Sequence, residues 1–374
     1  MTVNPRGTDE MTGRHWTELD TPVVLVDLER LERNIERMAT LARTHRVALR
    51  PHVKTHKSIA IARMQVAAGA VGLTAAKLDE AEVFARAGFE DLFIAYELVT
   101  AAKLERAIAL AGRVRLSFGV DSPEGIEMAA AAARGAGTRL RVRIEIDSGL
   151  HRCGVPADEA VALARLVAAR PELELEGVFT HAGHAYAAGS ARELDRIGRE
   201  EANSVLRAAE LIGSVEVVSV GNTPTAARSI AQPGVTEARP GNYVFYDGMQ
   251  VALGAARRED CALTVAATII SRPAPDRAVL DAGAKTLGLD RGAHGTSSLP
   301  HYGSLVGTNG TLARLSEEHG VLELPVSSAV RIGETVRILP NHACAVANLA
   351  AGYAVIRADR VVDWWRVDAA GAVH

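Results

Sequence analysis

Apolar and polar positions alternate along residues 21–248 in a way that predicts strands followed by helices. The first apolar run covers residues 22–27 (PVVLVD) and has the length of one buried strand. The stretch after it has apolar residues three and four positions apart, which form one stripe on a helix: Leu28, Leu31, Ile35, Met38 and Leu41. Such a stripe packs on a sheet, so we expect a strand and a helix that covers it.

Further apolar runs follow the same scheme, with helical or mixed stretches between them. They cover residues 47–53, 70–75, 91–96, 114–120, 140–146, 175–180 and 215–220. Repeats of strand and helix, eight over about 230 residues, are typical of a (β/α)8 barrel of the TIM type. A doubly wound open sheet has the same periodicity and is the alternative fold.

The pattern changes after residue 254, where β-rich runs are joined by glycine, proline and charged turns. These runs lie at residues 261–270, 277–289, 320–325, 330–340 and 353–365. They predict a second, mainly β domain. We therefore expect three parts, namely an N-terminal tail (1–20), a barrel (21–250) and a β-rich C-terminal domain (251–374).

Composition narrows the classes of partner. The 374 residues are 48% hydrophobic and 23% charged, as in a globular chain that builds its core without disulfides. Lysine plus arginine (42) nearly balance aspartate plus glutamate (45), and the net charge of −3 gives no field that attracts nucleic acid or anionic lipid. We expect a small-molecule partner, with no nucleic acid and no membrane.

Cysteine usage and the N-terminal residues bear on cellular location. The chain has three cysteines, far apart and without a disulfide framework: Cys153, Cys261 and Cys344. Residues 1–20 have no apolar core like that of a signal peptide, and no apolar run reaches the ~18 residues that span a bilayer. We therefore expect a cytoplasmic protein.

Residues 50–58 (RPHVKTHKS) end a predicted strand in a cluster of cations and imidazoles. Catalytic residues of barrel enzymes lie at the C-terminal ends of the strands, where Lys54 is predicted to lie. A lysine there can form a Schiff base with an aldehyde, and His52, His56 and Lys57 would favour its reactive neutral amine. A solvated basic strand end is the structural alternative.

Residues 145–155 (EIDSGLHRCGV) form a second strand end, with Asp147, His151 and Arg152 beside a glycine turn. The guanidinium of Arg152 can donate hydrogen bonds to an oxyanion such as a phenolate. A structural turn that Asp147 bridges is the alternative interpretation.

Residues 219–225 (SVGNTPT) follow another apolar run and have the composition of an anion-binding loop. Gly221 permits close approach of the backbone, and Asn222 and Thr223 offer donors. The loop would bind phosphate, especially if a helix begins near Thr225. Glycine, asparagine and proline also make ordinary turns.

Residues 239–247 (RPGNYVFYD) would complete that phosphate site through Gly241 and Asn242. Arg239 would face the nitrogen of a pyridine ring. Residues 180–186 (THAGHAY) end another strand and carry three candidate side chains: His181, His184 and Tyr186. Core or turn histidines are the alternative for the last segment.

Residues 340–348 (PNHACAVAN) close an apolar strand with His342 and Cys344 separated by one residue. In extended backbone, residues two apart point to the same side, so imidazole and thiolate would share one metal ion. Sulfur with imidazole favours zinc over magnesium. A buried free cysteine beside a hydrogen-bonded histidine is the alternative.

Taken in order, RPHVKTHK, EIDSGLHRCG, GNTPT, RPGNY and PNHAC resemble the fold-type III pyridoxal-phosphate enzymes, which share the barrel of alanine racemase. More closely, the chain resembles the D-serine dehydratase and D-threonine aldolase group from Thr21 to the C-terminus. It is the order of the segments that makes this resemblance specific.

The resemblance implies a role for each matching residue. Lys54 would carry pyridoxal phosphate. The cofactor would also be bound by Tyr186, Thr223, Gly241 and Asn242. Where family members have a cofactor-contacting tyrosine, this chain has Phe179, which lacks the hydroxyl.

The resemblance also implies a lyase that acts on D-β-hydroxy amino acids with a divalent cation at His342 and Cys344. Zinc is expected first, and manganese or magnesium are alternatives. D-threonine aldolases place aspartate where this chain has Cys344, so we expect a dehydratase that converts D-serine to pyruvate and ammonia. Lys54 would remove the Cα proton, and the cation would help the β-hydroxyl leave.

Other functions are alternatives to this dehydratase. Retro-aldol cleavage to glycine and an aldehyde needs the same lysine and cation, with His52, His181 or His184 as the base. An amino-acid racemase would leave the metal site idle, and a pyridoxal-phosphate carrier would need no second domain. Members of this fold usually form head-to-tail dimers, so we also expect a homodimer.

Overall fold

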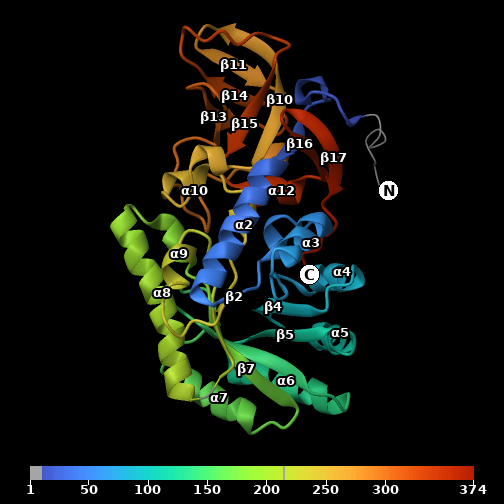
Figure 1. Ribbon diagram of the computed structural model, residues 1–374, viewed down its shortest axis with the longest axis vertical. Coiled ribbons are helices and arrows are strands. Elements are labelled where there is room, and N and C mark those ends of the chain that lie inside the picture. Colours follow the sequence, from blue (N-terminus) through green and yellow to red (C-terminus); the bar gives the residue numbers. More distant parts are fainter. Residues whose placement is uncertain (1–10, 214) are drawn as a thin grey trace. The chain divides into compact units, whose positions relative to one another are not determined.

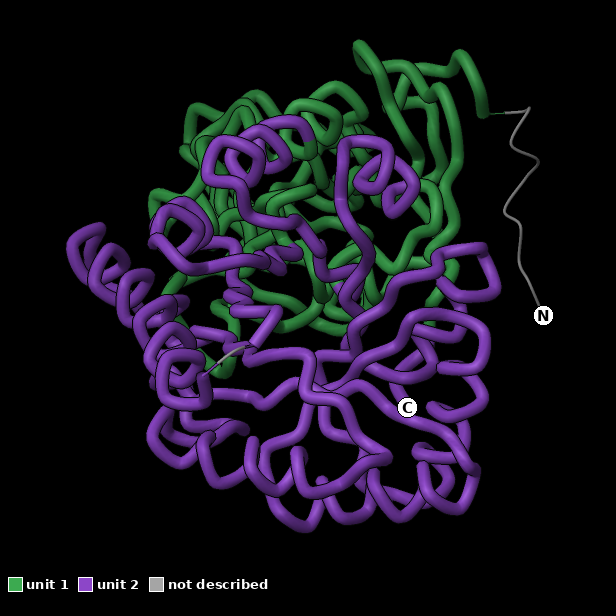
Figure 2. The backbone as a smooth tube through the Cα atoms, turned by 60° about the horizontal axis from the view of Figure 1, so that its bottom comes forward, with its two compact units in different colours: residues 1–35, 55–60, 242–370 green, residues 36–54, 61–241, 371–374 purple. Residues whose placement is uncertain are grey.

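The computed structural model describes residues 11–213 and 215–374 (Figure 1). The chain divides into two compact units (Figure 2), of which unit 1 comprises Met1–Ile35, Thr55–Ala60 and Asn242–Ala370, and unit 2 comprises Glu36–Lys54, Ile61–Gly241 and Gly371–His374. The predicted division at residues 20 and 250 uses continuous stretches and stays a prediction. Of the predicted tail, residues 1–10 lie outside the described residues.

Unit 2 is built around eight parallel strands in the order β2-β9-β8-β7-β6-β5-β4-β3. They are β2 (Ala48–Leu49), β3 (Leu73–Ala75), β4 (Asp91–Glu97), β5 (Arg115–Val120), β6 (Leu140–Ile146), β7 (Leu173–Thr180), β8 (Val217–Val220) and β9 (Glu237–Ala238). A parallel bridge between His52 and Thr74 joins the two ends of this order. The predicted (β/α)8 barrel is confirmed.

Helices connect these strands and pack on them, as the alternating pattern predicts. They are α4 (Leu78–Arg86), α5 (Ala101–Ala111), α6 (Pro123–Gly135), α7 (Ala160–Ala168), α8 (Ala191–Ile212) and α9 (Ala226–Ser229). Thr100, Ser122 and Ser190 cap α5, α6 and α8, because each side-chain oxygen accepts a backbone N–H of the first turn. Two more helices, α2 (Leu28–His45) and α3 (Ile59–Ala67), contain residues of both units.

The interior of the barrel contains paired charges as well as apolar side chains. Arg143, which is 1% exposed, donates to Glu176 and to Oε1 of Glu237, at 2.6 Å each. Arg50 donates to Oε2 of Glu237 at 2.7 Å and to Asp91 at 2.6 Å. A buried charge is costly unless it is paired, so these side chains depend on one another.

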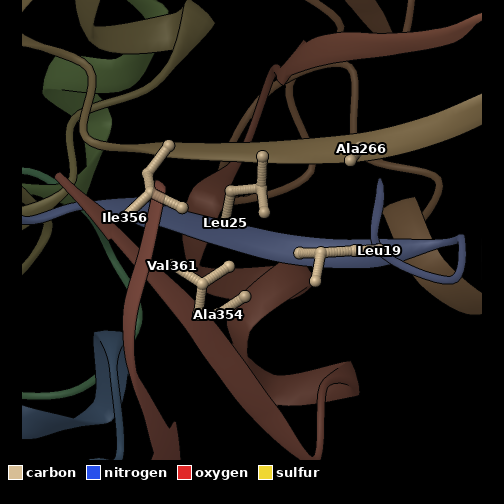
Figure 3. Packing of buried hydrophobic residues seen from close by; sticks show 6 residues of the cluster. All are labelled: Leu19, Leu25, Ala266, Ala354, Ile356 and Val361. Atoms are coloured by element: carbon tan, nitrogen blue, oxygen red, sulfur yellow. The ribbon is translucent and has the colours of Figure 1, made fainter. Parts of the chain in front are cut away.

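Unit 1 contains a nine-stranded, mainly antiparallel sheet in the order β11-β14-β13-β12-β15-β10-β1-β16-β17. Its strands are β1 (Val23–Asp27), β10 (Leu263–Ala274), β11 (Arg277–Leu280), β12 (Gly303–Leu305), β13 (Thr311–Leu315), β14 (Gly320–Glu323), β15 (Thr335–Pro340), β16 (Gly352–Arg357) and β17 (Arg360–Arg366). Figure 3 shows one core cluster, in which Leu19 and Leu25 lie with Ala266, Ile356 and Val361. The predicted mainly β region is confirmed.

The first predicted strand belongs to a different sheet from the one expected. β1 pairs antiparallel with β10 and parallel with β16, so the run at 22–27 lies in the sheet of unit 1 and not in the barrel. The eighth barrel strand is β9, which has only two residues and leaves no periodic pattern. A continuous apolar run fits any strand buried on both faces, so periodicity does not identify the sheet.

Short elements complete unit 1. They are η1 (Trp16–Glu18), η4 (Asn242–Val244), η5 (Arg258–Asp260), α10 (Gly248–Ala252), α11 (Ala284–Leu287) and α12 (Ala343–Leu349). Among the described residues, none of the helices combines the length and the apolar character needed to cross a membrane.

Candidate active site

Lys54 lies in η2 (Val53–Thr55), which follows β2 after residues 50–52. Lys54 thus lies at the C-terminal end of the barrel strands, from which the catalytic residues of barrel enzymes project. His52 is 9% exposed, and its backbone N–H donates to the Pro240 carbonyl at 3.0 Å. Burial, with the charges of Lys54, Arg239 and His181, holds the pKa of His52 well below its usual range, so its ring is neutral at neutral pH.

His56 and Lys57 of this segment have structural contacts within unit 1. Nδ1 of His56 accepts the Ser58 N–H at 3.0 Å, and the Tyr353 hydroxyl donates to the His56 carbonyl at 2.6 Å. The Lys57 carbonyl accepts the Ala369 N–H at 3.0 Å. An influence of His56 and Lys57 on Lys54 stays a prediction.

Arg239 follows β9 and is enclosed by groups of unit 2. It donates to the Ser219 hydroxyl and, at 2.6 Å, to the Thr180 carbonyl. Its guanidinium lies 5.2 Å from the centre of the Phe179 ring. Burial lowers the pKa of Arg239 to about 10, which leaves the side chain charged at neutral pH.

The loop that follows β8 is hydrogen-bonded to the carboxyl group of Glu201. The Gly221 N–H donates to Oε1 of Glu201 at 3.0 Å, and the Thr225 hydroxyl donates to Oε2 at 2.5 Å. Nδ2 of Asn222 donates to the Ala182 carbonyl at 2.6 Å, while Thr223 is 7% exposed. The helix predicted near Thr225 is α9, but its four residues are too few to add a strong helix dipole.

The histidines of the 180–186 segment have different surroundings. Nδ1 of His181 lies 2.5 Å from the Gly221 carbonyl, so this side chain joins the loop after β8. His184 and Tyr186 lie in η3 (Gly183–Ala187), where burial lowers the pKa of His184 and Tyr186 is 8% exposed. Of the two histidines, His181 is the one bonded to the predicted phosphate loop.

The turn after β6 is bridged by Asp147, as the alternative interpretation of residues 145–155 predicted. Oδ1 of Asp147 accepts the N–H groups of Gly149 and His151 at 2.8 and 3.0 Å, and Oδ2 lies 2.7 Å from Nδ1 of His151. The side chain of Arg152 is 48% exposed and lies 3.7 Å from Glu145. A cofactor contact by Arg152 stays a prediction.

Carboxyl groups gather with a thiol near the ends of β4, β5 and β6. One ligand atom each of Glu97, Asp121 and Cys153 lies within 4.8 Å of the others. Burial and a hydrogen bond with Glu97 raise the pKa of neighbouring Glu145 to about 9. Glu145 is therefore protonated at neutral pH, which reduces its repulsion with Glu97.

His342 and Cys344 meet at the junction of β15 and α12 in unit 1. His342 is the N-cap of α12 and Cys344 lies in its first turn, so the predicted extended backbone is wrong for this pair. The helical turn nevertheless brings the two side chains into a hydrogen bond. Sγ of Cys344 also lies 3.4 Å from Oγ1 of Thr55 and 3.6 Å from Nδ2 of Asn242.

The two groups favour each other's charged forms. Burial alone would lower the pKa of His342, but Cys344 and Asp290 raise that pKa well above its usual range. Burial alone would raise the pKa of the Cys344 thiol, but His342 lowers it. Thiolate is the form in which cysteine binds metals.

Two family models match the chain. The alanine racemase N-terminal domain matches residues 26–248, and a putative serine dehydratase domain matches residues 262–356. A D-threo-3-hydroxyaspartate dehydratase of Delftia sp. (strain HT23) is 37% identical, over 93% of this chain and 97% of the relative. A D-threonine aldolase of Arthrobacter sp. is 33% identical, over 94% and 93%.

A solved structure of the same enzyme class is also similar to this chain. It is a D-threo-3-hydroxyaspartate dehydratase in the metal-free form, with one cysteine replaced by alanine. The TM-score is 0.88 and the identity 36%, and the match covers 94% of this chain and 98% of that one.

The chain belongs to the fold-type III pyridoxal-phosphate family of D-serine dehydratases and D-threonine aldolases. It is thus a pyridoxal-phosphate-dependent lyase.

The polar groups of unit 2 suit the cofactor of this family. Nε of Arg239 and Nδ1 of His52 are buried and have no hydrogen-bond partner among the described residues. The first is a donor that would suit an unprotonated pyridine nitrogen, and the second belongs to a neutral ring, which has one donor nitrogen and one acceptor nitrogen. Lys54, Thr223 and Gly241 belong to the same unit.

Asn242 differs from its expected role in this family. Its side chain donates to Oδ2 of Asp247 at 2.7 Å, beside Cys344 in unit 1. Its Oδ1 is buried without a hydrogen-bond partner among the described residues, and a cofactor contact by Asn242 stays a prediction.

The donors at the family's expected metal position fit a divalent cation. Nδ1 of His342 lies 2.6 Å from Oδ2 of Asp290, which leaves Nε2 for a ligand bond, as in the carboxylate–histidine pairs of zinc sites. Asp247 accepts the Ala343 N–H at 2.9 Å and so fixes the start of α12. The sequence analysis assigned a role to neither aspartate, because each is far from His342 along the chain. Asp247 ends the 239–247 segment, whose other residues were assigned to the phosphate site, and Asp290 stands in no recognisable motif.

Proposed function

We propose that this lyase dehydrates a D-β-hydroxy amino acid, with pyridoxal phosphate on Lys54 and a divalent cation at His342 and Cys344. D-Serine is the predicted substrate, and pyruvate and ammonia are its products. The lyase class follows from family membership, whereas the reaction, the substrate and the cation are parts of this proposal.

The observation that carries the proposal is the thiol–imidazole pair of unit 1. Cys344 and His342 are hydrogen-bonded, and Asp290 orients the imidazole from its other nitrogen. Two protein donors leave positions for water and substrate, as a catalytic metal site requires. Racemisation would not need this pair, which argues for an elimination or a cleavage.

The donor types favour zinc. Thiolate and imidazole together suit zinc better than manganese or magnesium, which prefer oxygen ligands. A homologous dehydratase with a cysteine replaced by alanine has been solved in a metal-free form, which supports metal binding in that relative. We extend metal binding to this chain and assign Cys344 as one ligand.

Each candidate residue then has a definite task. The cofactor supplies an electron sink for negative charge at Cα. Lys54 takes the Cα proton, and Arg239 stays charged and donates without giving up a proton. His342 and Cys344 hold the cation, which supplies a Lewis acid for a hydroxyl group.

Retro-aldol cleavage is the second candidate, because a relative 33% identical is a D-threonine aldolase. That reaction needs a base for the hydroxyl proton. Neutral His52, with an unpartnered Nδ1 among the described residues, has the required protonation state. His181 and His184 are the other two predicted bases.

Product analysis separates the two candidates. The purified chain, loaded with pyridoxal phosphate and zinc, is incubated with D-serine, D-threonine and D-threo-3-hydroxyaspartate. Dehydration gives a keto acid and ammonia, whereas retro-aldol cleavage gives glycine and an aldehyde. Glycine as the main product from every substrate would replace the dehydratase proposal by the aldolase.

Borohydride reduction tests Lys54 independently of turnover. We expect a stable adduct at Lys54 in the wild-type chain and none at this position in Lys54→Ala. Lys285→Ala is the control, because Lys285 is 60% exposed and paired with Glu317 and Glu318. A wild-type chain that forms no adduct at Lys54 would contradict the proposal.

A further inference from the structure

A fully buried carboxyl group lies behind the loop that connects β8 to α9. Glu201, on α8, is 0% exposed. Its oxygens accept from the Gly221 N–H at 3.0 Å and from the Thr225 hydroxyl at 2.5 Å, and its side chain also bonds Ser229. One carboxyl group therefore fixes both ends of residues 221–225.

The residues between these two anchors are the predicted phosphate binders. Asn222 and Thr223 lie between Gly221 and Thr225, and Nδ2 of Asn222 is fixed by the Ala182 carbonyl. With both ends bound to one side chain, the backbone of the loop has little freedom. Glu201 is thus bonded to both ends of the loop that is predicted to bind phosphate.

The carboxyl group of Glu201 titrates near neutral pH. Burial raises the pKa of Glu201 to about 7, although the bonds from Thr225 and Gly221 and the charge of Arg239 oppose this shift. Protonation does not break the anchor, because a carboxylic acid can donate to the Thr225 hydroxyl, and its other oxygen still accepts the Gly221 N–H.

Arg239, after barrel strand β9, carries the positive charge that lowers the pKa of Glu201. The elements packed against α8 carry further titratable groups. They include His181 after β7, His184 in η3, Arg143 and Glu145 in β6, and Arg228 in α9, which pairs with Asp195 of α8.

We propose that Glu201 is a positioning residue for the phosphate-binding loop and takes up a proton when a phosphate dianion binds there. This inference rests on the proposed function, since it assigns residues 221–225 to the cofactor phosphate. A phosphate carries about −1.5 to −2 charges near neutral pH, and like charges near one another favour protonation of the carboxyl group.

Linkage makes this coupling measurable. If phosphate binding raises the proton affinity of Glu201, a rise in pH weakens phosphate binding by the same coupling. Above about pH 7, where the free chain has lost this proton, affinity for the phosphorylated cofactor should fall by up to about tenfold per pH unit. Pyridoxal, which lacks the phosphate, should not show this component.

The experiment compares dissociation constants of pyridoxal phosphate and pyridoxal from about pH 6 to about pH 9. The variants are Glu201→Gln, which keeps the shape and cannot titrate, and Glu210→Gln, on the exposed side of the same helix. We expect wild type and Glu210→Gln to share one steep profile for pyridoxal phosphate. Glu201→Gln should have a flatter profile, and for pyridoxal all three should agree.

Proton uptake by the wild-type chain gives a second readout that needs no variant. Calorimetry in buffers of different ionisation enthalpy should detect more protons taken up with pyridoxal phosphate than with pyridoxal at about pH 8. Equal uptake with both would overturn the inference, and so would equal pH profiles of wild type and Glu201→Gln.

Failure of the proposed function gives a different result. A wild-type chain without a borohydride-stable adduct at Lys54 would remove the cofactor assignment. Inorganic phosphate then serves as the test compound: a pH-dependent difference in its binding between wild type and Glu201→Gln supports the role of Glu201, and the absence of that difference overturns it.

Discussion

Nδ1 of His342 lies 2.6 Å from Oδ2 of Asp290, although 52 positions separate the two residues. This bond fixes the orientation of the imidazole ring, and the pKa of Asp290 is lowered chiefly by it. A carboxylate in this position also raises the basicity of the opposite ring nitrogen, which strengthens a metal–ligand bond. Asp290 is therefore expected to act on the cation through His342.

Asp290→Asn should weaken zinc binding by about 10- to 100-fold, the usual loss when such a supporting carboxylate is removed. Competition with a zinc chelator measures this affinity directly, without turnover. Asp276→Asn is the control, since Asp276 is exposed in the same unit. Equal zinc affinity of wild type and Asp290→Asn would show that the aspartate only braces the fold.

Cys344→Asp should change the preferred cation. Replacing thiolate by carboxylate removes the soft donor, so affinity for zinc should fall relative to affinity for manganese and magnesium. Metal analysis of the protein after dialysis against equal amounts of the three ions measures the preference. Unchanged retention of zinc would mean that Cys344 is not a ligand.

Glu237→Gln should cost stability at neutral pH. Burial opposes ionisation of Glu237, but Arg143, Arg50 and Arg239 lower its pKa to about 2. Because this folded-state pKa lies below the unfolded value, the stabilisation is present above the unfolded pKa and is lost as pH falls through the folded one.

Urea unfolding at several pH values tests this sign. We expect Glu237→Gln to be less stable than wild type by about 3 kcal/mol near pH 7, with the difference shrinking from about pH 5 to about pH 2. Glu174→Gln, on β7 and 39% exposed, should lose less than about 1 kcal/mol. A constant difference across the pH range would contradict the assignment.

Gly221→Ala should displace Arg239. A Cβ atom at Gly221 would lie 2.7 Å from Nη2 of Arg239, whose side chain is held by Ser219 and Thr180. We expect the dissociation constant of pyridoxal phosphate to rise at least tenfold, which corresponds to a loss of about 1.4 kcal/mol in binding free energy. Gly135→Ala, where the added Cβ meets nothing within 4 Å, should bind the cofactor like wild type.

Strand–helix periodicity predicted most of the barrel, because each long strand and its helix leave a local pattern. The predicted runs at 91–96 and 140–146 correspond closely to β4 (Asp91–Glu97) and β6 (Leu140–Ile146). β9 was missed because its two residues, Glu237 and Ala238, lie in no apolar run, whereas the equally short β2 lies inside the apolar run predicted at 47–53. The membership of β1 in another sheet depends on pairing with β10 and β16, which are far away in the sequence.

The sequence by itself determined the types of chemistry present: a lysine at a strand end, a glycine loop for an anion, and imidazole beside thiol within three residues. Local spacing suffices for these, because each motif is read over a few consecutive positions. Only the tertiary structure brought Asp290 to His342 and Glu201 to Gly221. Hydrogen bonds between residues distant in sequence form only when folding brings their elements together, so no short motif contains them.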